Sequence, residues 1–259
     1  MSFETGLDVR WNELARTFDY GCGVFGPKPE YRRLDAIRTS LRDPDCEGPD
    51  PVYSIVMDVG REEHLDELRK RMLLFGVVAY AAGRLGLEPV RSQGHVHAIS
   101  PHSGWSAPEL FEIWEGRAIV YAQQYADDTP GICVAVEAGP GDHVVVPPGW
   151  AHCVINADPN SSMIFAACCD REYGFVYDKV RSHGGLAWFP VLDKQSKINW
   201  QPNPRYKRSV LSQHAARAYP ELNLIGSMPI YQEFSRDPDS MQWVSDPSRY
   251  ADLWPSFVP

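Results

Sequence analysis

Residues 141–156 read GDHVVVPPGWAHCVIN, and this stretch decides the fold. It opens with Gly141, has a Pro-Pro-Gly turn at 147–149, and continues to His152 and Asn156. Glycine and proline at such positions form tight turns, and the apolar residues between them favour short strands. The stretch therefore predicts two short strands joined by a turn that sets the position of His152.

A second segment, 94–97 (GHVH), lies earlier in the chain and is followed by Glu109. Alternate residues of a strand share a face, so His95 and His97 can point together into a barrel. If Glu109 begins the next strand and His152 lies on a strand of the second half, their side chains converge. Three imidazoles and a carboxylate with open positions would suit Fe, Mn, Ni, Co or Zn.

Short β-prone runs separated by turn residues surround these two segments. Their spacing predicts a mainly β fold, an antiparallel sandwich or barrel. Apolar residues recur with helical spacing at 29–41 and 62–74, and a shorter helix is predicted near 213–219. The predicted strands are 52–59, 75–80, 110–114, 118–124, 132–137, 143–146 and 163–169.

The character of the sequence changes twice along the chain. Residues 1–50 are polar and rich in Gly and Pro, and we expect them to pack on the barrel as an N-terminal segment with helical elements. Residues 51–206 hold both motifs and are predicted to form the barrel. Residues 207–259 are a C-terminal extension rich in Pro, Ser and Trp, expected to lie as a strap on the barrel or around a second subunit.

Composition narrows the classes of function. The 259 residues carry 34 acidic and 25 basic side chains, and a net charge of -9 argues against non-specific nucleic-acid binding. No apolar stretch reaches the length of a membrane span, and the first residues do not resemble a secretory signal. The six cysteines contain no CxxC pair, so we expect a reduced, cytoplasmic protein. The adjacent Cys168 and Cys169 are interpreted as small buried residues rather than a redox site.

Both segments match the signature motifs of the cupin superfamily. Residues 141–156 fit the pattern G-x5-P-x-G-x2-H-x3-N throughout. The first motif departs from the pattern, because the gap from His97 to Glu109 is longer than usual. Either the intervening loop, 98–108, lies over the mouth of the site, or another residue is the acidic ligand.

Spacing favours Glu109 among the acidic residues that follow the loop. Six residues separate it from Gly116, as the pattern requires, whereas Glu112 and Glu115 lie too close to that glycine. His102, within the inserted loop, is interpreted as a polar loop residue rather than a ligand.

Within this superfamily the sequence resembles the cupin-type phosphoglucose isomerases of archaea and some bacteria. The resemblance covers roughly residues 1–206 and rests on the segments 3–6 (FETG), 32–34 (RRL), 50–53 (DPVY), 94–97 (GHVH), 109–111 (ELF), 147–156 (PPGWAHCVIN), 173–174 (YG) and 203–206 (NPRY). It implies a homodimer that interconverts glucose 6-phosphate and fructose 6-phosphate. It also implies one divalent transition metal per chain, with Fe2+ favoured over Mn2+, Ni2+, Co2+ or Zn2+.

The resemblance also assigns roles to individual residues. The metal ligands would be His95, His97, Glu109 and His152. From the chemistry of the isomerisation we add the hypothesis that Glu109 also transfers the proton. Tyr173 would assist catalysis and Tyr53 would bind the sugar, although either could be a core tyrosine. Phe111 would line the substrate site, and the backbone of Gly94 would help to hold the phosphate.

Several hydroxyl groups of the family are missing from this sequence. Val78, Phe111 and Cys168 stand where the family has hydroxyl-bearing residues. Cations could hold the phosphate in place of these hydroxyls, and the candidates are Arg84, Arg91, Arg171, Lys179 and Arg181. The missing hydroxyls also leave alternatives open, namely an isomerase or epimerase of another sugar, a metal-dependent cupin dioxygenase, and a non-catalytic sensor or storage cupin.

Overall fold

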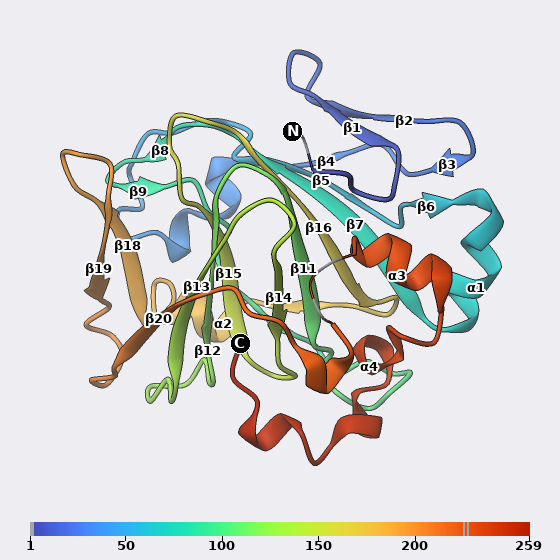
Figure 1. Cartoon of the computed structure of the whole chain (residues 1–259). Coiled ribbons are helices and arrows are strands. Elements are labelled where there is room, and N and C mark those ends of the chain that lie inside the picture. Colours follow the sequence, from blue (N-terminus) through green and yellow to red (C-terminus); the bar gives the residue numbers. More distant parts are fainter. Residues whose placement is uncertain (1–2, 225, 227) are drawn as a thin grey trace.

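The fold is built around two β-sheets, seen in a computed structural model that describes residues 3–224, 226 and 228–259 (Figure 1). The larger sheet has six strands in the order β14-β11-β16-β7-β5-β4, and the smaller has four in the order β15-β12-β13-β20. Strand pairs are antiparallel except for β13 with β20. The six-stranded sheet comprises β4 (Glu30–Arg32), β5 (Tyr53–Met57), β7 (Leu73–Tyr80), β11 (Glu109–Glu115), β14 (His143–Val146) and β16 (Met163–Asp170), and the four-stranded sheet β12 (Ala118–Gln123), β13 (Cys133–Ala138), β15 (Ala151–Asn156) and β20 (Leu211–Ala215).

Four strands of the six-stranded sheet, β7, β11, β14 and β16, are buried on both faces, which explains their nearly continuous apolar runs. On β11, Phe111 and Ile113 point inward and join the core between the two sheets. Leu110 and Trp114 point outward and join a second core beneath the C-terminal extension. Because successive side chains alternate across a strand, one strand supplies both cores.

The strand predictions are confirmed, with ends that differ by a few residues. Each of the seven predicted runs overlaps a strand of one of the two sheets. His152 lies on β15 of the four-stranded sheet, as expected for a strand from the second half of the barrel. The mainly β cupin architecture is therefore present.

The helix predicted at 29–41 is wrong. Residues 30–32 form β4, which pairs with β5, and two 3-10 turns follow at Leu34–Ala36 and Arg38–Ser40. The apolar residues of the pattern, Leu34 and Ile37 among them, are buried as expected. The spacing of these apolar residues therefore marked burial rather than a helix. The start of the segment is extended because it pairs with β5 at the edge of the sheet.

The other two helix predictions fare differently. At 62–74, a 3-10 turn leads into α1 (Leu65–Lys70), so a helix is present over the middle of the predicted range. Met72 follows with a left-handed φ of 54°, and β7 begins at Leu73. The helix predicted near 213–219 is wrong, because residues 211–215 form β20 along the open edge of β13. Sheet pairing overrides local helix propensity there.

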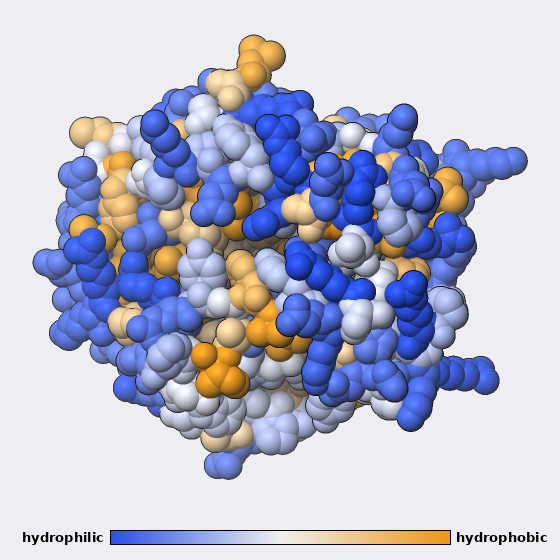
Figure 2. All heavy atoms as spheres, turned by 180° about the vertical axis from the view of Figure 1, so that it is seen from behind, coloured by the Kyte–Doolittle hydropathy of each residue, from blue (hydrophilic) through white to orange (hydrophobic). Residues whose placement is uncertain are grey.

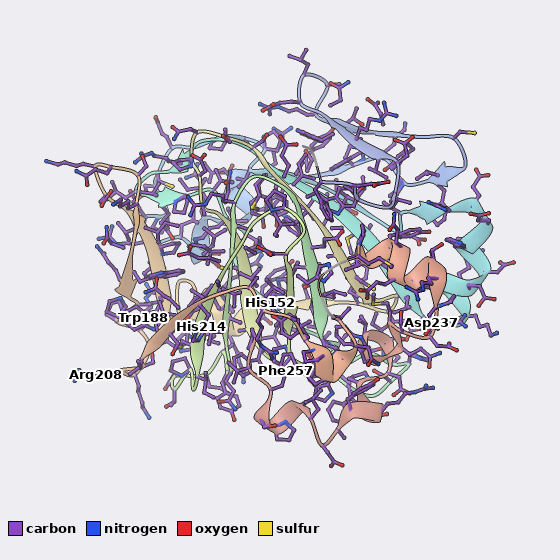
Figure 3. The ribbon with its side chains drawn as sticks, viewed as in Figure 1. His152, Trp188, Arg208, His214, Asp237 and Phe257 are labelled. Atoms are coloured by element: carbon purple, nitrogen blue, oxygen red, sulfur yellow. The ribbon has the colours of Figure 1, made fainter. Side chains whose placement is uncertain are left out.

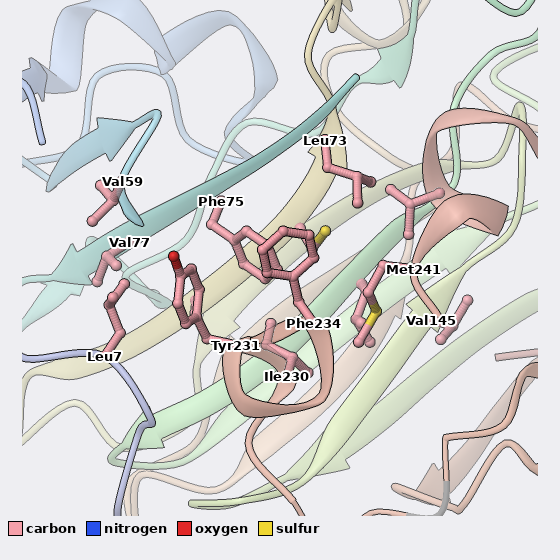
Figure 4. Close-up of a cluster of buried hydrophobic side chains, with 14 of the residues drawn as sticks. Leu7, Val59, Leu73, Phe75, Val77, Val145, Ile230, Tyr231, Phe234 and Met241 are labelled. Atoms are coloured by element: carbon pink, nitrogen blue, oxygen red, sulfur yellow. The ribbon is translucent and has the colours of Figure 1, made fainter. Parts of the chain in front are cut away.

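The C-terminal extension packs on the barrel of its own chain. Its helices α3 (Ile230–Arg236) and α4 (Gln242–Ser245) cover the outer face of the six-stranded sheet. Figure 4 shows Tyr231 and Phe234 against Phe75 of β7, and their rings lie 5.0 and 5.6 Å from that of Phe75. Contact with a second subunit stays a prediction.

Short elements frame the two sheets. No helix among the described residues is long and apolar enough to cross a membrane. The surface in Figure 2 is mainly hydrophilic, with apolar side chains in small groups. The remaining strands and the last helix are β1 (Val9–Asn12), β2 (Thr17–Tyr20), β3 (Val24–Phe25), β6 (Gly60–Arg61), β8 (Arg84–Leu85), β9 (Glu88–Pro89), β10 (Val96–His97), β17 (Phe175–Val176), β18 (Trp188–Leu192), β19 (Ile198–Pro202) and α2 (Asp178–Ser182).

Candidate metal centre

Three histidines and one glutamate from different strands converge inside the barrel. His95 and His97 lie at β10, Glu109 begins β11, and His152 belongs to β15, where Figure 3 labels it between the sheets. One ligand atom from each of these residues lies within 4.8 Å of the others. The cluster contains the four residues whose spacing predicted a metal site.

Main-chain hydrogen bonds join the two motifs directly. The amide of His95 donates to the carbonyl of His152 at 3.1 Å, and the amide of His152 donates back at 2.9 Å. Gly94 precedes this bridge with a φ of +90°, and a Cβ there would lie 2.8 Å from Leu186. A larger residue at 94 would therefore disturb the strand that carries two of the histidines.

The inserted loop, 98–108, supports the cluster from behind. The carbonyl of Ala107 accepts a hydrogen bond from His97 Nδ1 at 2.9 Å. The Ser106 hydroxyl donates to the His97 carbonyl and accepts from the amide of Gly149, so the loop also fastens the Pro-Pro-Gly turn. His102 is exposed and lies outside the cluster. The longer gap thus leaves Glu109 at the position of the acidic residue.

Hydrogen bonding fixes which imidazole nitrogen faces the centre. Nδ1 of His97 and Nδ1 of His152 both lie against main-chain carbonyls, which can only accept, so each Nδ1 carries the proton. In the neutral rings, Nε2 then presents a lone pair. These atoms lie 3.2 and 2.9 Å from Oε2 of Glu109, another lone-pair donor. Such a contact requires a shared proton or a cation between the atoms.

The electrostatics of the cluster favour an ionised Glu109. Burial acts to raise the pKa of this carboxyl group, but without a cation a proton shared with His97 and His152 outweighs burial and holds the pKa far below its usual value. The same contact with Glu109 raises the pKa of His97 against the effect of burial. Burial lowers the pKa of His95 well below its usual value, with smaller contributions from the other two histidines. A neutral imidazole and a carboxylate are the forms in which these side chains bind metals.

Two nitrogens of the cluster have unsatisfied bonding capacity. Nε2 of His95 and Nε2 of His97 are buried and have no hydrogen-bond partner among the described residues. Burying such atoms without a partner is costly, and a bound cation would satisfy both. With Nδ1 of His97 and His152 held by carbonyls, as metal-ligating histidines usually are, the donor set fits a divalent transition metal.

A cavity opens from the cluster between the two sheets. It is narrow, with a solvent-accessible volume of about 60 Å³. His95, Glu109 and His152 form part of its wall, and Tyr53 and Phe111 also line it. Their contact with a substrate stays a prediction. The remaining lining residues are Arg32, Ile55, Met57, Val78, Tyr80, Ser92, Gln93, Val154, Phe165, Ala167, Phe175 and Tyr177.

Other candidates from the sequence lie away from this cavity. Tyr173 is outside its lining and packs on Phe175, with ring centroids 5.3 Å apart. Arg84 donates to the Ser196 hydroxyl at 2.7 Å. Arg91 is buried in an ion pair with Glu88 at 2.7 Å and holds the main chain around it.

The remaining cations suggested by the sequence are also engaged elsewhere. Arg171 pairs with Asp58, and Lys179 pairs with an exposed aspartate. Arg181 stands behind the cavity wall, donating to Gln93 at 3.0 Å and lying over the ring of Tyr177 at 4.7 Å.

Several lining residues were missed by sequence reasoning. Arg32 reaches the cavity because β4 pairs with β5 in a register that sets it opposite Tyr53. No sequence pattern near Arg32 predicts that pairing, although Arg32 lies in 32–34 (RRL), one of the segments that carry the family resemblance. Tyr177 lines the cavity, whereas Tyr173, the tyrosine predicted to assist catalysis, does not. Residues four apart share a face only along a regular strand, and β17 spans just Phe175–Val176.

Two facing sheets with a His and Glu cluster between them define a cupin with a candidate metal centre. The family model described as "Glucose-6-phosphate isomerase (GPI)" matches residues 35–207, most of the chain. The chain belongs to the glucose-6-phosphate isomerase family.

Individual relatives agree with the family model. The chain is similar to "Glucose-6-phosphate isomerase" of Thermococcus kodakarensis, with 28% identity over 211 residues that cover 78% of this chain and 96% of the relative. The protein of the same name from Pyrococcus furiosus is 26% identical over 196 residues, covering 73% and 95%. Among solved structures, oxalate oxidase with the substrate analogue glycolate matches 41% of this chain and 46% of that chain, with 20% identity and a TM-score of 0.30.

Proposed function

We propose that the protein interconverts glucose 6-phosphate and fructose 6-phosphate with one divalent transition metal, preferably Fe2+, bound by His95, His97, Glu109 and His152. The observation that supports this most strongly is the convergence of these side chains on a cavity in a chain of this family. The enzyme activity in the names of the relatives supports this choice of substrate.

Aldose–ketose isomerisation moves hydrogen between C1 and C2 while the carbonyl and hydroxyl groups exchange. The difficult step is the formation of an enediol, which requires a base near these carbons and stabilisation of negative charge on oxygen. A bound divalent cation supplies that stabilisation as a Lewis acid.

Glu109 is the residue placed to move the proton. Its carboxyl group lies at the cavity wall, 2.9 Å from Nε2 of His152, where it could accept a proton from one carbon and return it to the other. Tyr53 and Tyr177, which both line the cavity near Arg32, would bind the sugar. Tyr173 would act only indirectly, by supporting Phe175.

Apolar residues would keep water from the reacting carbons. Phe111, Phe165 and Val78 line the cavity beside the ligands and are buried. Water that reaches an enediol can protonate either of its faces, so exclusion of water protects the intermediate from the wrong product.

The experiment is a coupled assay of fructose 6-phosphate isomerisation after metal removal. Purified protein is stripped with a chelator and reloaded separately with Fe2+, Mn2+, Ni2+, Co2+ and Zn2+. We expect activity to vanish on stripping and to return with metal. His152→Ala should abolish both metal binding and turnover, whereas His102→Ala, in the exposed loop, should retain both.

Stoichiometric metal binding without turnover by any reloaded form would contradict the phosphosugar reaction. Unphosphorylated sugars and oxygen consumption would then be assayed, because the same ligands would serve a different sugar isomerase or a dioxygenase. Full activity of the stripped protein would contradict the role of the metal.

A further inference from the structure

Arg32 is the one lysine or arginine among the described residues that line the cavity. Every other cation suggested for the phosphate is paired elsewhere or stands behind the wall. The cavity therefore brings a single positive side chain into the space where the substrate would bind.

The guanidinium of Arg32 has unused bonding capacity. Its Nε is buried without a hydrogen-bond partner, and no carboxylate of the described residues forms an ion pair with it. The side chain as a whole is half-buried and contacts Tyr53, and arginines withdrawn from water usually pair with an acidic group. Arg91, by contrast, is buried and bonded to Glu88 and to two carbonyls. The bonds of Arg91 are therefore those of a structural residue, whereas the guanidinium of Arg32 can still bind an anion.

The surroundings of Arg32 keep it charged and hold it in place. Burial would lower its pKa, but Tyr53 and Tyr177 raise the pKa above the usual arginine value. Both tyrosines line the same cavity, and Arg181 lies over the ring of Tyr177 at 4.7 Å. A phosphate beside Arg32 would thus meet one guanidinium, two hydroxyl groups and a second positive charge behind them.

The backbone explains why Arg32 faces the cavity. It ends β4, opposite Tyr53 of β5, and its carbonyl accepts a hydrogen bond from the amide of Val52 at 2.8 Å. The next residue, Arg33, points the other way, with its side chain 61% exposed and 3.6 Å from Asp50. Two adjacent arginines are therefore divided between the cavity and the surface, and Arg33 provides a matched control.

We propose that Arg32 binds the phosphate of the substrate and makes the site selective for phosphorylated over unphosphorylated sugars. This inference rests on the proposed function, because it assumes that a sugar occupies the cavity. A guanidinium can bind two phosphate oxygens at once, and this bidentate grip compensates for the absence of a hydroxyl group at Val78 in the cavity wall.

The test is a calorimetric titration of the metal-loaded protein with 6-phosphogluconate and with gluconate, which differ only in the phosphate. We expect Arg32→Gln to weaken 6-phosphogluconate binding at least tenfold and to change gluconate binding less than twofold. Arg32→Lys should bind 6-phosphogluconate more tightly than Arg32→Gln does, because lysine keeps the positive charge but cannot donate two parallel hydrogen bonds to the phosphate. Arg33→Gln should bind both compounds as the wild type does.

Unchanged binding of 6-phosphogluconate by Arg32→Gln would overturn the inference, as would an equal weakening for both compounds. Thermal unfolding should shift little in this variant, because Arg32 has no ion pair to lose; a large shift together with equal weakening would assign it a structural role. Binding does not require turnover. If binding depends on Arg32 but the protein has no isomerase activity, the phosphate site is retained and the proposed reaction is rejected. If the protein is an active isomerase but binding does not depend on Arg32, only the phosphate site is rejected.

Discussion

Strand β11 carries two buried carboxylates, Glu109 and Glu112, on opposite faces. Each has a histidine Nε2 at 2.9 Å, His152 for the first and His143 for the second. Glu109 faces the cavity between the sheets, whereas Glu112 lies under the C-terminal extension. The two faces of one strand therefore hold nearly the same chemical pair.

The two carboxylates differ in the groups that face their oxygens. Oε1 of Glu112 accepts from His143 and from the amide of Ile230, and Oε2 accepts from Trp114, so donors surround the carboxylate. Glu109 instead faces imidazole nitrogens that carry lone pairs. A count of donors and acceptors thus separates a structural pair from a metal site where residue types alone do not.

The largest expected effect is that of Glu109→Gln. The amide cannot act as a base, so we expect kcat to fall by about 10²–10⁴-fold, with little change in unfolding temperature. Fructose 6-phosphate turnover is measured at matched metal occupancy, determined by mass spectrometry of bound metal. Unchanged kcat with full metal would remove the proton-transfer role and favour direct hydride transfer between the two carbons.

Glu112→Gln should show the opposite combination. It removes a buried charge that accepts from three donors, and we expect the free energy of unfolding to fall by about 3 kcal/mol while kcat of the folded protein is unchanged. Urea denaturation followed by tryptophan fluorescence measures the decrease. Glu115→Gln, at the exposed end of the same strand, is the control and should leave stability unchanged. A lower kcat without lower stability would erase the distinction between the two faces.

The metal cluster was predictable because its signals are local. Alternation within a strand brings His95 and His97 to one face, and turn residues place His152. Arg32 was not predictable in the same way, because its position depends on the pairing of β4 with β5. That pairing joins segments separated by residues 33–52, whose irregular path has no periodic pattern.

The C-terminal extension was the hardest part to predict. Its aromatic residues required burial somewhere, but the sequence left open whether the barrel or a second subunit would cover them. The docking of α3 depends on Glu112, an acidic residue on an otherwise apolar face, which accepts from the amide of Ile230. The site follows from spacing within short segments, whereas this packing depends on contacts across the whole chain.

The smallest expected effect concerns pH and the docked extension. His64 lies 3.2 Å from the Tyr231 hydroxyl and 3.5 Å from the Ser235 hydroxyl. Burial lowers its pKa, and Arg61 adds to this effect, while the nearby Glu63 opposes it. The folded protein therefore binds a proton here less readily than the unfolded chain does. The resulting contribution to stability is present above pH 6.5, the usual histidine value, and is lost as the pH falls through the lower value of the folded state.

This contribution should be smaller than the loss of stability expected for Glu112→Gln. Unfolding free energies of the wild type and His64→Gln are measured between pH 7.5 and 5.5, with the exposed His214→Gln as control. We expect wild-type stability to fall more steeply with acid than that of His64→Gln, because only the wild type gains a proton at this position on unfolding. Parallel curves would show that protonation of His64 does not oppose docking, and the extension would then be held by its apolar contacts and by Glu112 alone.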